Sequence, residues 1–481
     1  MSALGTTLDV LQFDTNTGKQ RKSVLPTGDL LGLVKRITFG FTKSEYQFAR
    51  SRGYSGYLEH QLNHLAIDDS ALDARLAGLE FPTLTMTPEQ LGLANGSDVQ
   101  NQLVRARILR AVFSKRQLFE RVVDVWTDHF NIWLFDDGLE PQQKTWDDAN
   151  VIRAHALGTF PEMLAASAHS PVMLEYLNND TNIASAPNQN YARELMELHT
   201  MGVDGGYTQD DVLQVARCFT GWRYYDANTT NTALRYTFQF RSSQHDNSQK
   251  IVLGHIIAAG GGQQDGETVL KILVAHPSTA TYVATKLLRH FWGDTPPQSL
   301  INSVASVFTA TQGDIKAMLR AIFRADLDPA SEAKFKRPFH LFASALRATG
   351  ATVATPGNLQ TALIGSGHSP FNWQTPDGYA DTLTAWSGLL LPRWNFGASI
   401  MNSEYGSSAV VVDLPTLLIG VPAPYTAAAI VKRINELLFG GFMPGPEAAA
   451  LTTYLSPGAP TTAKIREAIG LAIGSPAFQW A

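Results

Sequence analysis

The sequence contains very little cysteine, with one residue, Cys218, in a chain of 481. A single thiol cannot form an internal disulfide, and it cannot build a cysteine-only zinc site within one chain. Cys218 is followed by Phe219 and has no histidine close in sequence, which indicates a small buried residue rather than an activated nucleophile. These observations argue against disulfide-stabilised scaffolds and against cysteine-based catalysis.

Charge and long apolar runs are also scarce. Charged residues make up 17% of the chain, the net charge is −5, and there is no basic stripe that could neutralise phosphates, so we expect no nucleic-acid partner. No stretch reaches about 18 consecutive apolar residues, so we expect no membrane span. The N-terminal segment lacks the basic start and apolar run of a secretory signal. The sequence alone therefore predicts a cytoplasmic protein, or a mature chain whose targeting segment is absent from the sequence.

Apolar residues at helical spacing dominate the remaining pattern. One example is the apolar stripe formed by Phe119, Val122, Trp126 and Trp133. Only the segment 223–256, rich in Tyr, Phe, Thr and Gln, indicates short strands or a hairpin. We find no repeat and no clear linker. The pattern predicts a mainly α protein, with an irregular lead-in at 1–27 and a single large helical domain at 28–481 that contains a small β-hairpin insert.

The densest group of reactive side chains lies between Asn190 and Trp222, a stretch that predicts a helix, a glycine turn and a second helix. The first helix carries Arg193, Glu194, Glu197 and His199. At about 100° per residue, Arg193, Glu194 and Glu197 fall within one sector of the helix, whereas His199 points away from them. The two glutamates therefore share a face of the helix, and their role depends on which residues lie opposite that face.

One interpretation of this face is an enzyme site. Two neighbouring carboxylates beside an arginine can separate their pKa values and act as acid and base. His129, at the edge of the apolar stripe of an earlier helix, could join them and help to hold a divalent metal, although no particular cofactor is singled out. We predict catalytic roles for one set of residues, Arg193, Glu194, Glu197 and His129. We predict ligand-binding roles for a second set, His245, Asp246, His368 and Trp373.

Two other interpretations of the same stretch compete with the enzyme site. In a structural interpretation, Arg193 pairs with Glu197 at a spacing of four, Glu194 accepts hydrogen bonds from a helix end or loop amide, and His199 is a satisfied core histidine. In a calcium interpretation, VDGGYTQDD would form half of an EF-hand loop, but Thr200 and Gly202 stand where the first carboxylates belong. A glycine turn followed by a Thr208–Asp211 helix cap explains that segment better.

Several motifs together resemble one bacterial family. They are WTDHFNIW, NYARELMELHTMGVDGGYTQDDV and FTGW, supported by RITFGFT, HPSTATYVATKLLRHF, KFKRPF, QTPDGY, RWNF and the terminal SPAFQW. This combination, which covers nearly the whole chain, resembles the family catalogued as domain of unknown function 1800. The resemblance implies that the protein is exported, whereas the N-terminal segment does not predict export. Family genes often neighbour a sulfatase-like family, which implies polymer or envelope metabolism by association.

From these observations we expect an α-rich enzyme, hydrolytic or metal-assisted, that acts on a saccharide or another polymer. The alternative is a non-catalytic binding or assembly protein of the cell envelope. In that case the aromatic residues would form a ligand platform, and the polar cluster would hold helices in register.

Overall fold

The computed structural model describes residues 30–324, 333–406 and 409–481. The predicted lead-in at 1–27 lies outside the described residues. Within them the chain is built from α-helices α2 to α24 and three two-stranded antiparallel sheets, which confirms the mainly α prediction.

The helices of the first half of the chain are α2 (Leu30–Ile37), α3 (Lys43–Leu62), α4 (Ser70–Gly78), α5 (Pro88–Leu93), α6 (Gly96–Phe113), α7 (Gln117–His129), α8 (Glu140–Asp147), α9 (Phe160–Ala168), α10 (Pro171–Tyr176), α11 (Asn190–Glu194) and α12 (Gln209–Cys218). Those of the second half are α13 (Gln264–Ala275), α14 (Pro277–Phe291), α15 (Gln298–Thr311), α16 (Ile315–Ile322), α17 (Pro338–Ala348), α18 (Gly357–Gly365), α19 (Leu383–Trp386), α20 (Leu390–Met401), α21 (Leu414–Leu417), α22 (Ala427–Leu438), α23 (Gly445–Leu455) and α24 (Thr462–Gly474).

Shorter helical pieces connect these elements. Two are π-helices, η3 (Asp148–Arg153) and η5 (Leu195–Thr200). The others are single 3₁₀ turns, η1 (His64–Ala66), η2 (Pro82–Thr85), η4 (Asn179–Thr181), η6 (Thr232–Leu234), η7 (Ser242–Gln244) and η8 (Pro476–Gln479).

The predicted β insert consists of two hairpins. Strand β1 (Trp222–Tyr224) pairs with β2 (Phe238–Phe240), and β3 (Lys250–Val252) pairs with β4 (His255–Ile257), all antiparallel. A third pair, β5 (Thr352–Val353) with β6 (Val410–Val411), was not predicted. Two-residue strands that are far apart in sequence leave no periodic signal.

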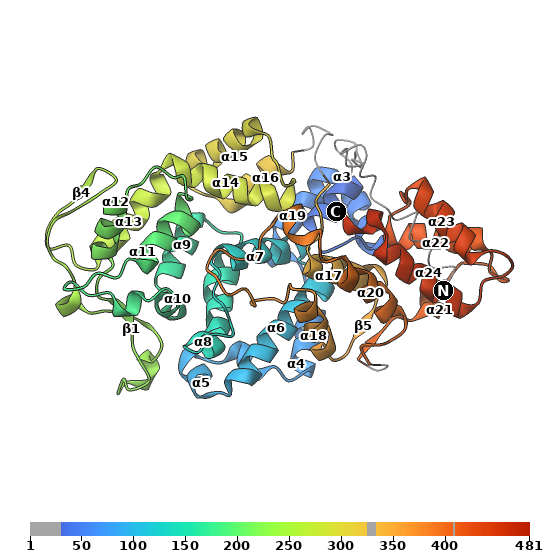
Figure 1. Cartoon of the computed structure of the whole chain (residues 1–481), viewed down its shortest axis with the longest axis horizontal. Helices are drawn as coiled ribbons and strands as arrows, with labels where there is room; N and C mark the ends of the chain where they lie inside the picture. Colours follow the sequence, from blue (N-terminus) through green and yellow to red (C-terminus); the bar gives the residue numbers. More distant parts are fainter. Residues whose placement is uncertain (1–29, 325–332, 407–408) are drawn as a thin grey trace.

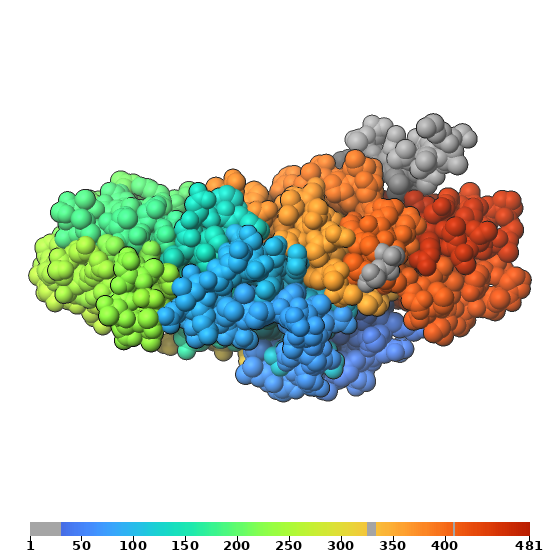
Figure 2. Space-filling view, turned by 90° about the horizontal axis from the view of Figure 1, so that it is seen from below, coloured from blue at the N-terminus to red at the C-terminus, as the bar shows by residue number. Residues whose placement is uncertain are grey.

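Buried apolar side chains of the described residues form two main clusters. The first runs from Leu33 to Phe323, and the second combines residues 39–134 with residues 339–478. The molecule is elongated: α11, α12 and α13 lie at one end, α21 to α24 at the other, and α6, α7 and α17 between them (Figure 1). A view turned by 90° shows the same elongated outline (Figure 2). The single-domain organisation remains a prediction.

Charged side chains join the two clusters through a set of residues that we call the sealed ion network: Arg107, Glu120, Asp124 and Arg337, which are buried, and Arg153, which is half-buried. Arg107 lies 3.1 Å from a Glu120 oxygen and 3.0 Å from an Asp124 oxygen. Arg153 reaches Glu120 at 2.6 Å, and Arg337, at the start of α17, reaches Asp124 at 2.6 Å. Helix α7 is therefore buried on its polar side as well as on its apolar stripe.

Candidate functional site

The central segment begins as predicted and then departs from a regular α-helix. Helix α11 ends at Glu194 and continues as the π-helix η5, in which the Thr200 hydroxyl donates to the Leu195 carbonyl at 2.7 Å. π-Helical turns are rare and frequently lie at functional sites. After the glycine turn, Thr208 and Asp211 form the predicted capping box of α12.

Glu194 and Glu197 are half-buried, and among the described residues neither side chain has a hydrogen bond or an ion pair. Arg193 donates instead to the Gln209 side chain at 2.9 Å. The structural interpretation is therefore wrong on two points, because Arg193 does not pair with Glu197 and Glu194 binds no described amide. The π turn changes the spacing that an i,i+4 pair requires.

Helix α14 places Tyr282 and Lys286 near this face. Lys286 is half-buried, and within the described part of the chain its ammonium has no hydrogen bond or ion pair, only the Tyr282 ring at 5.5 Å. Tyr282 packs against Gly202, where an added Cβ would lie 2.8 Å from a ring carbon. Gly202 also has a φ of 80°, so a side chain there would strain the backbone and displace the tyrosine.

The loop 372–381 brings Asp377 to the same place. Asn131 holds this loop by donating to the carbonyls of Trp373 and Thr375, at 3.0 and 2.8 Å. Gly378 approaches α7 so closely that an added Cβ would lie 2.1 Å from the Asp128 carbonyl oxygen. The motif WTDHFNIW therefore positions the motif QTPDGY, although the two are far apart in sequence.

Electrostatics joins Glu194, Glu197, Tyr282, Lys286 and Asp377 into one group, which we call the polar junction. Burial, and then the charge of Glu197, raises the pKa of Glu194. Burial also raises the pKa of Tyr282 to about 12, and Glu197 and Asp377 add to that rise. Burial lowers the pKa of Lys286, against the opposing effect of Asp128 and Asp377. Each member therefore lies within interaction range of others in the group.

Asp128, at the end of α7, connects the polar junction to the sealed ion network. Arg337 binds the Asp128 carboxylate, and the Asp128 side chain remains 19% exposed. Burial raises the pKa of Asp128 to about 6; Arg337 opposes the rise and the Asp124 charge adds to it. A carboxyl with this pKa can exchange a proton near neutral pH.

His129 and His199 lie buried beneath the junction. A ring nitrogen of His129, Nε2, lies 3.0 Å from the His199 carbonyl oxygen, whereas His129 Nδ1 and His199 Nε2 have no partner among the described atoms. Burial and the Lys286 charge lower the pKa of both rings, that of His199 to about 3. Both rings are therefore neutral, and His129 makes no described hydrogen bond to either glutamate.

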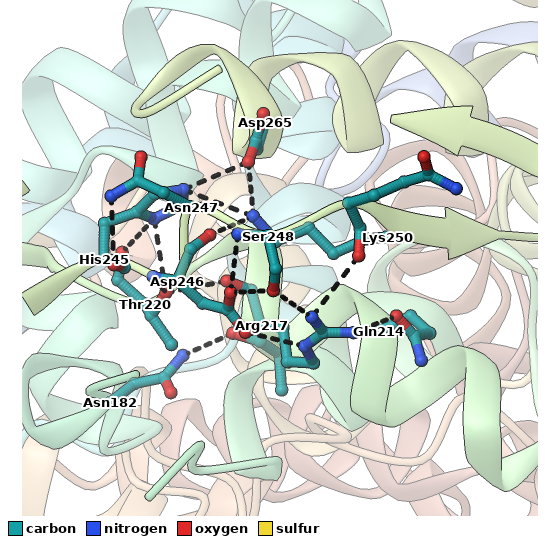
Figure 3. Close-up of polar contacts among 12 residues, drawn as sticks. Asn182, Gln214, Arg217, Thr220, His245, Asp246, Asn247, Ser248, Lys250 and Asp265 are labelled. Carbon is teal, nitrogen blue, oxygen red and sulfur yellow. Dashed lines mark hydrogen bonds and ion pairs between the residues drawn. The ribbon is translucent and has the colours of Figure 1, made fainter. Parts of the chain in front are cut away.

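His245 and Asp246 belong to a separate polar network, in which His245 is buried and Asp246 is half-buried (Figure 3). His245 Nδ1 lies 2.8 Å from the Thr220 carbonyl oxygen, and His245 Nε2 lies 3.0 Å from a carboxylate oxygen of Asp265. Lys250 donates to the same Asp265 oxygen at 2.6 Å. Asp246 accepts from Arg217 at 2.7 Å. These contacts join the β3–β4 hairpin to α12 and α13, and they engage both ring nitrogens of His245.

His368 and Trp373 lie in the aromatic part of the second half. His368 is buried, accepts from the Phe339 amide at 3.3 Å and stacks on Trp386. Trp373 is partly exposed and donates to Asp377 at 2.8 Å. Of the four predicted ligand-binding residues, Trp373 is therefore the one that the described contacts link to the polar junction.

Sequence reasoning missed Asp128, Tyr282, Lys286 and Asp377. All four lie inside motifs that carried the family resemblance, WTDHF, TATYVATKLLRHF and QTPDGY. The convergence of separate motifs was the available signal, but which members converge depends on tertiary structure. In the described residues no group of three or more His, Cys, Asp or Glu side chains has a geometry that could hold a metal.

The chain is thus an α-rich protein in which the half-buried, unpaired charges of Glu194, Glu197 and Lys286 come from two motifs and lie near the exposed Asp377 of a third. It belongs to the family described as "Protein of unknown function (DUF1800)", whose model matches residues 32–480. No curated protein and no solved structure matches the sequence. Within the part of the chain that the structure describes, no helix is both long and apolar enough to cross a membrane.

Proposed function

We propose that the chain is a hydrolase that performs acid–base chemistry at the polar junction on a saccharide or another polymer. The observation that carries the proposal is that Glu194, Glu197 and Lys286 are half-buried without partners in the described chain. Desolvating a charge without pairing it opposes folding, and such groups concentrate where chemistry needs them.

The proposed roles follow from the two glutamate environments. Glu194, whose pKa is raised by burial and by Glu197, is suited to donate a proton to the leaving oxygen. Glu197 then accepts a proton from the attacking water, so that one C–O bond breaks and one water is added. Lys286 donates hydrogen bonds to a substrate oxygen and helps to hold the scissile bond beside the two carboxylates.

Aromatic side chains around the junction support a saccharide or similar polymer as the substrate. The charge of Glu197 raises the pKa of both Tyr207 and Tyr282, and Trp373 donates a hydrogen bond to Asp377. Aromatic rings present flat apolar faces with a polar edge, which suits the apolar faces and hydroxyl rims of sugars.

Purified protein is to be tested against a panel of neutral and acidic polysaccharides by release of reducing ends. We expect Glu197→Gln and Glu194→Gln to lower the rate at least ~100-fold while Tm stays within a few degrees, because neither side chain has a described partner to lose. Glu80→Gln, at an exposed glutamate, is the matched control. Full activity in both variants contradicts the proposal.

The same experiment distinguishes the non-catalytic alternative. Saturable polysaccharide binding without any product, weakened in Glu197→Gln, would favour a binding or assembly protein. A large fall in Tm in both variants would instead assign the glutamates a structural role.

A further inference from the structure

A cavity between α4, α6 and the start of α18 lies outside every region described above. Its volume is about 250 Å³, and its lining includes Leu79, Phe81, Arg105, Thr355, Gly357 and Asn358. Figure 1 shows α18 beside α6, which carries Arg105. The cavity thus combines an apolar wall, two small polar side chains and one cation.

Arg105 faces this cavity with unused donors. Among the described residues its guanidinium has no hydrogen bond or ion pair, and its Nε is sealed from solvent without an acceptor. A sealed N–H group without an acceptor opposes folding, and nearly all such groups in proteins are satisfied. Arg107, on the same helix, has two carboxylate partners by contrast, Glu120 and Asp124.

A second positive feature adjoins Arg105. Helix α18 begins at Gly357, and no side chain caps its first amides. An added Cβ on Gly357 would lie 3.3 Å from Arg105 Nη2, so the guanidinium lies directly beside the helix start. The exposed amides and the helix dipole favour negative charge at this end, and a cation there is unfavourable unless an anion accompanies it.

We propose that this cavity binds an oxyanion, a phosphate or a carboxylate, carried on a small apolar body. The oxyanion accepts hydrogen bonds from Arg105 and from the first amides of α18, and the body packs on Leu79 and Phe81. Pockets for drug-sized ligands span roughly 300–1,000 Å³, so a cavity of this size suits a body of about one ring. This site is independent of the polar junction.

The test is calorimetric titration of the full chain with phenyl phosphate, benzoate, inorganic phosphate and benzyl alcohol. We expect saturable binding of phenyl phosphate or benzoate, with the stronger of the two identifying the oxyanion. We expect weaker binding of inorganic phosphate, which lacks the body, and no binding of benzyl alcohol, which lacks the charge. The absence of saturable binding of both aromatic anions at millimolar concentration overturns the proposal.

Variants assign the binding to this cavity. Arg105→Gln is expected to weaken binding of the aromatic anion at least tenfold, and Arg50→Gln, at an exposed arginine, to leave it unchanged. Gly357→Ala places a methyl group against the guanidinium without a positive φ and is also expected to weaken binding. If Arg105→Gln does not fold, Gly357→Ala decides. The proposal is overturned if the deciding variant binds the aromatic anion as tightly as the unmodified chain does.

Discussion

Asp128 interacts with both the sealed ion network and the polar junction, and the two regions differ in whether their charges are paired. In the network, each of Arg107, Arg153 and Arg337 binds a carboxylate at 3.1 Å or less. In the junction, Glu194, Glu197 and Lys286 are half-buried with no described partner. Paired buried charges fix the packing of helices, whereas unpaired ones leave donors and acceptors available to a ligand. The comparison can be tested by removing one charge at a time.

Breaking the network is expected to have the largest effect. Arg337→Met leaves Asp124 and Asp128 without their shared partner, which should lower the free energy of unfolding by about 3–5 kcal/mol. Urea denaturation measures this loss. Arg289→Met, at an exposed arginine without a described partner, is the control and should change stability by less than about 0.5 kcal/mol. Similar small losses in both variants would show that the network does not hold the helices.

Gly378→Ala tests the contact between the loop and α7, where the two regions meet. The residue has a φ of 73°, and its Cβ would overlap the Asp128 carbonyl oxygen. We expect a loss of about 2–3 kcal/mol in urea denaturation, together with displacement of Asp377. Gly441→Ala, which also has a positive φ but open space around its Cβ position, should cost only about 1 kcal/mol. Equal losses in the two variants would mean that the loop shifts without strain.

Glu140 is buried, like most residues of the sealed ion network, but it has no described ion pair, like the glutamates of the polar junction. Its Oε2 has no described partner, and burial raises its pKa to about 7. Because the folded state holds this proton more tightly than the unfolded chain, stability should fall as the pH rises from about 4.5 through 7, by roughly 1–3 kcal/mol. Glu140→Gln should flatten this part of the pH profile, measured by urea denaturation at several pH values. An unchanged profile would assign the effect to other groups.

Removing a charge from the junction is expected to have the smallest effect on stability. Lys286→Met keeps the length of the side chain and removes a desolvated ammonium, so the free energy of unfolding should stay constant or rise by up to about 1 kcal/mol. Thermal and urea denaturation measure the change. A loss above about 1 kcal/mol would mean that the ammonium stabilises the fold through its acidic neighbours and would narrow the difference between the two regions.

Helix α7 shows how far periodicity in the sequence can predict structure. The apolar stripe that includes Phe119 and Trp126 is buried as predicted. The polar side is buried too, because Arg337 comes from a distant segment to neutralise Asp124. A periodic pattern in the sequence identifies the apolar face of a helix. It does not identify the distant residue that covers the opposite, polar face.

The candidate site was predictable only in part for the same reason. Glu194 and Glu197 share one short segment, so local spacing was enough to single them out. Lys286 and Asp377 join them through folding, and no spacing rule relates a residue on α14 to one in a loop that Asn131 holds. The π turn of η5 was also beyond prediction, because it leaves no signature in the order of apolar residues.

The attachment of loop 372–381 to Asn131 has a consequence for biosynthesis. Glu194 of α11 and Glu197 of η5 leave the ribosome well before Asp377 does, because synthesis runs from the N-terminus. A nascent or truncated chain can therefore form α7 and η5 without a complete polar junction. Assembly of the site is delayed until the C-terminal part of the chain docks, which restricts any chemistry there to the finished protein.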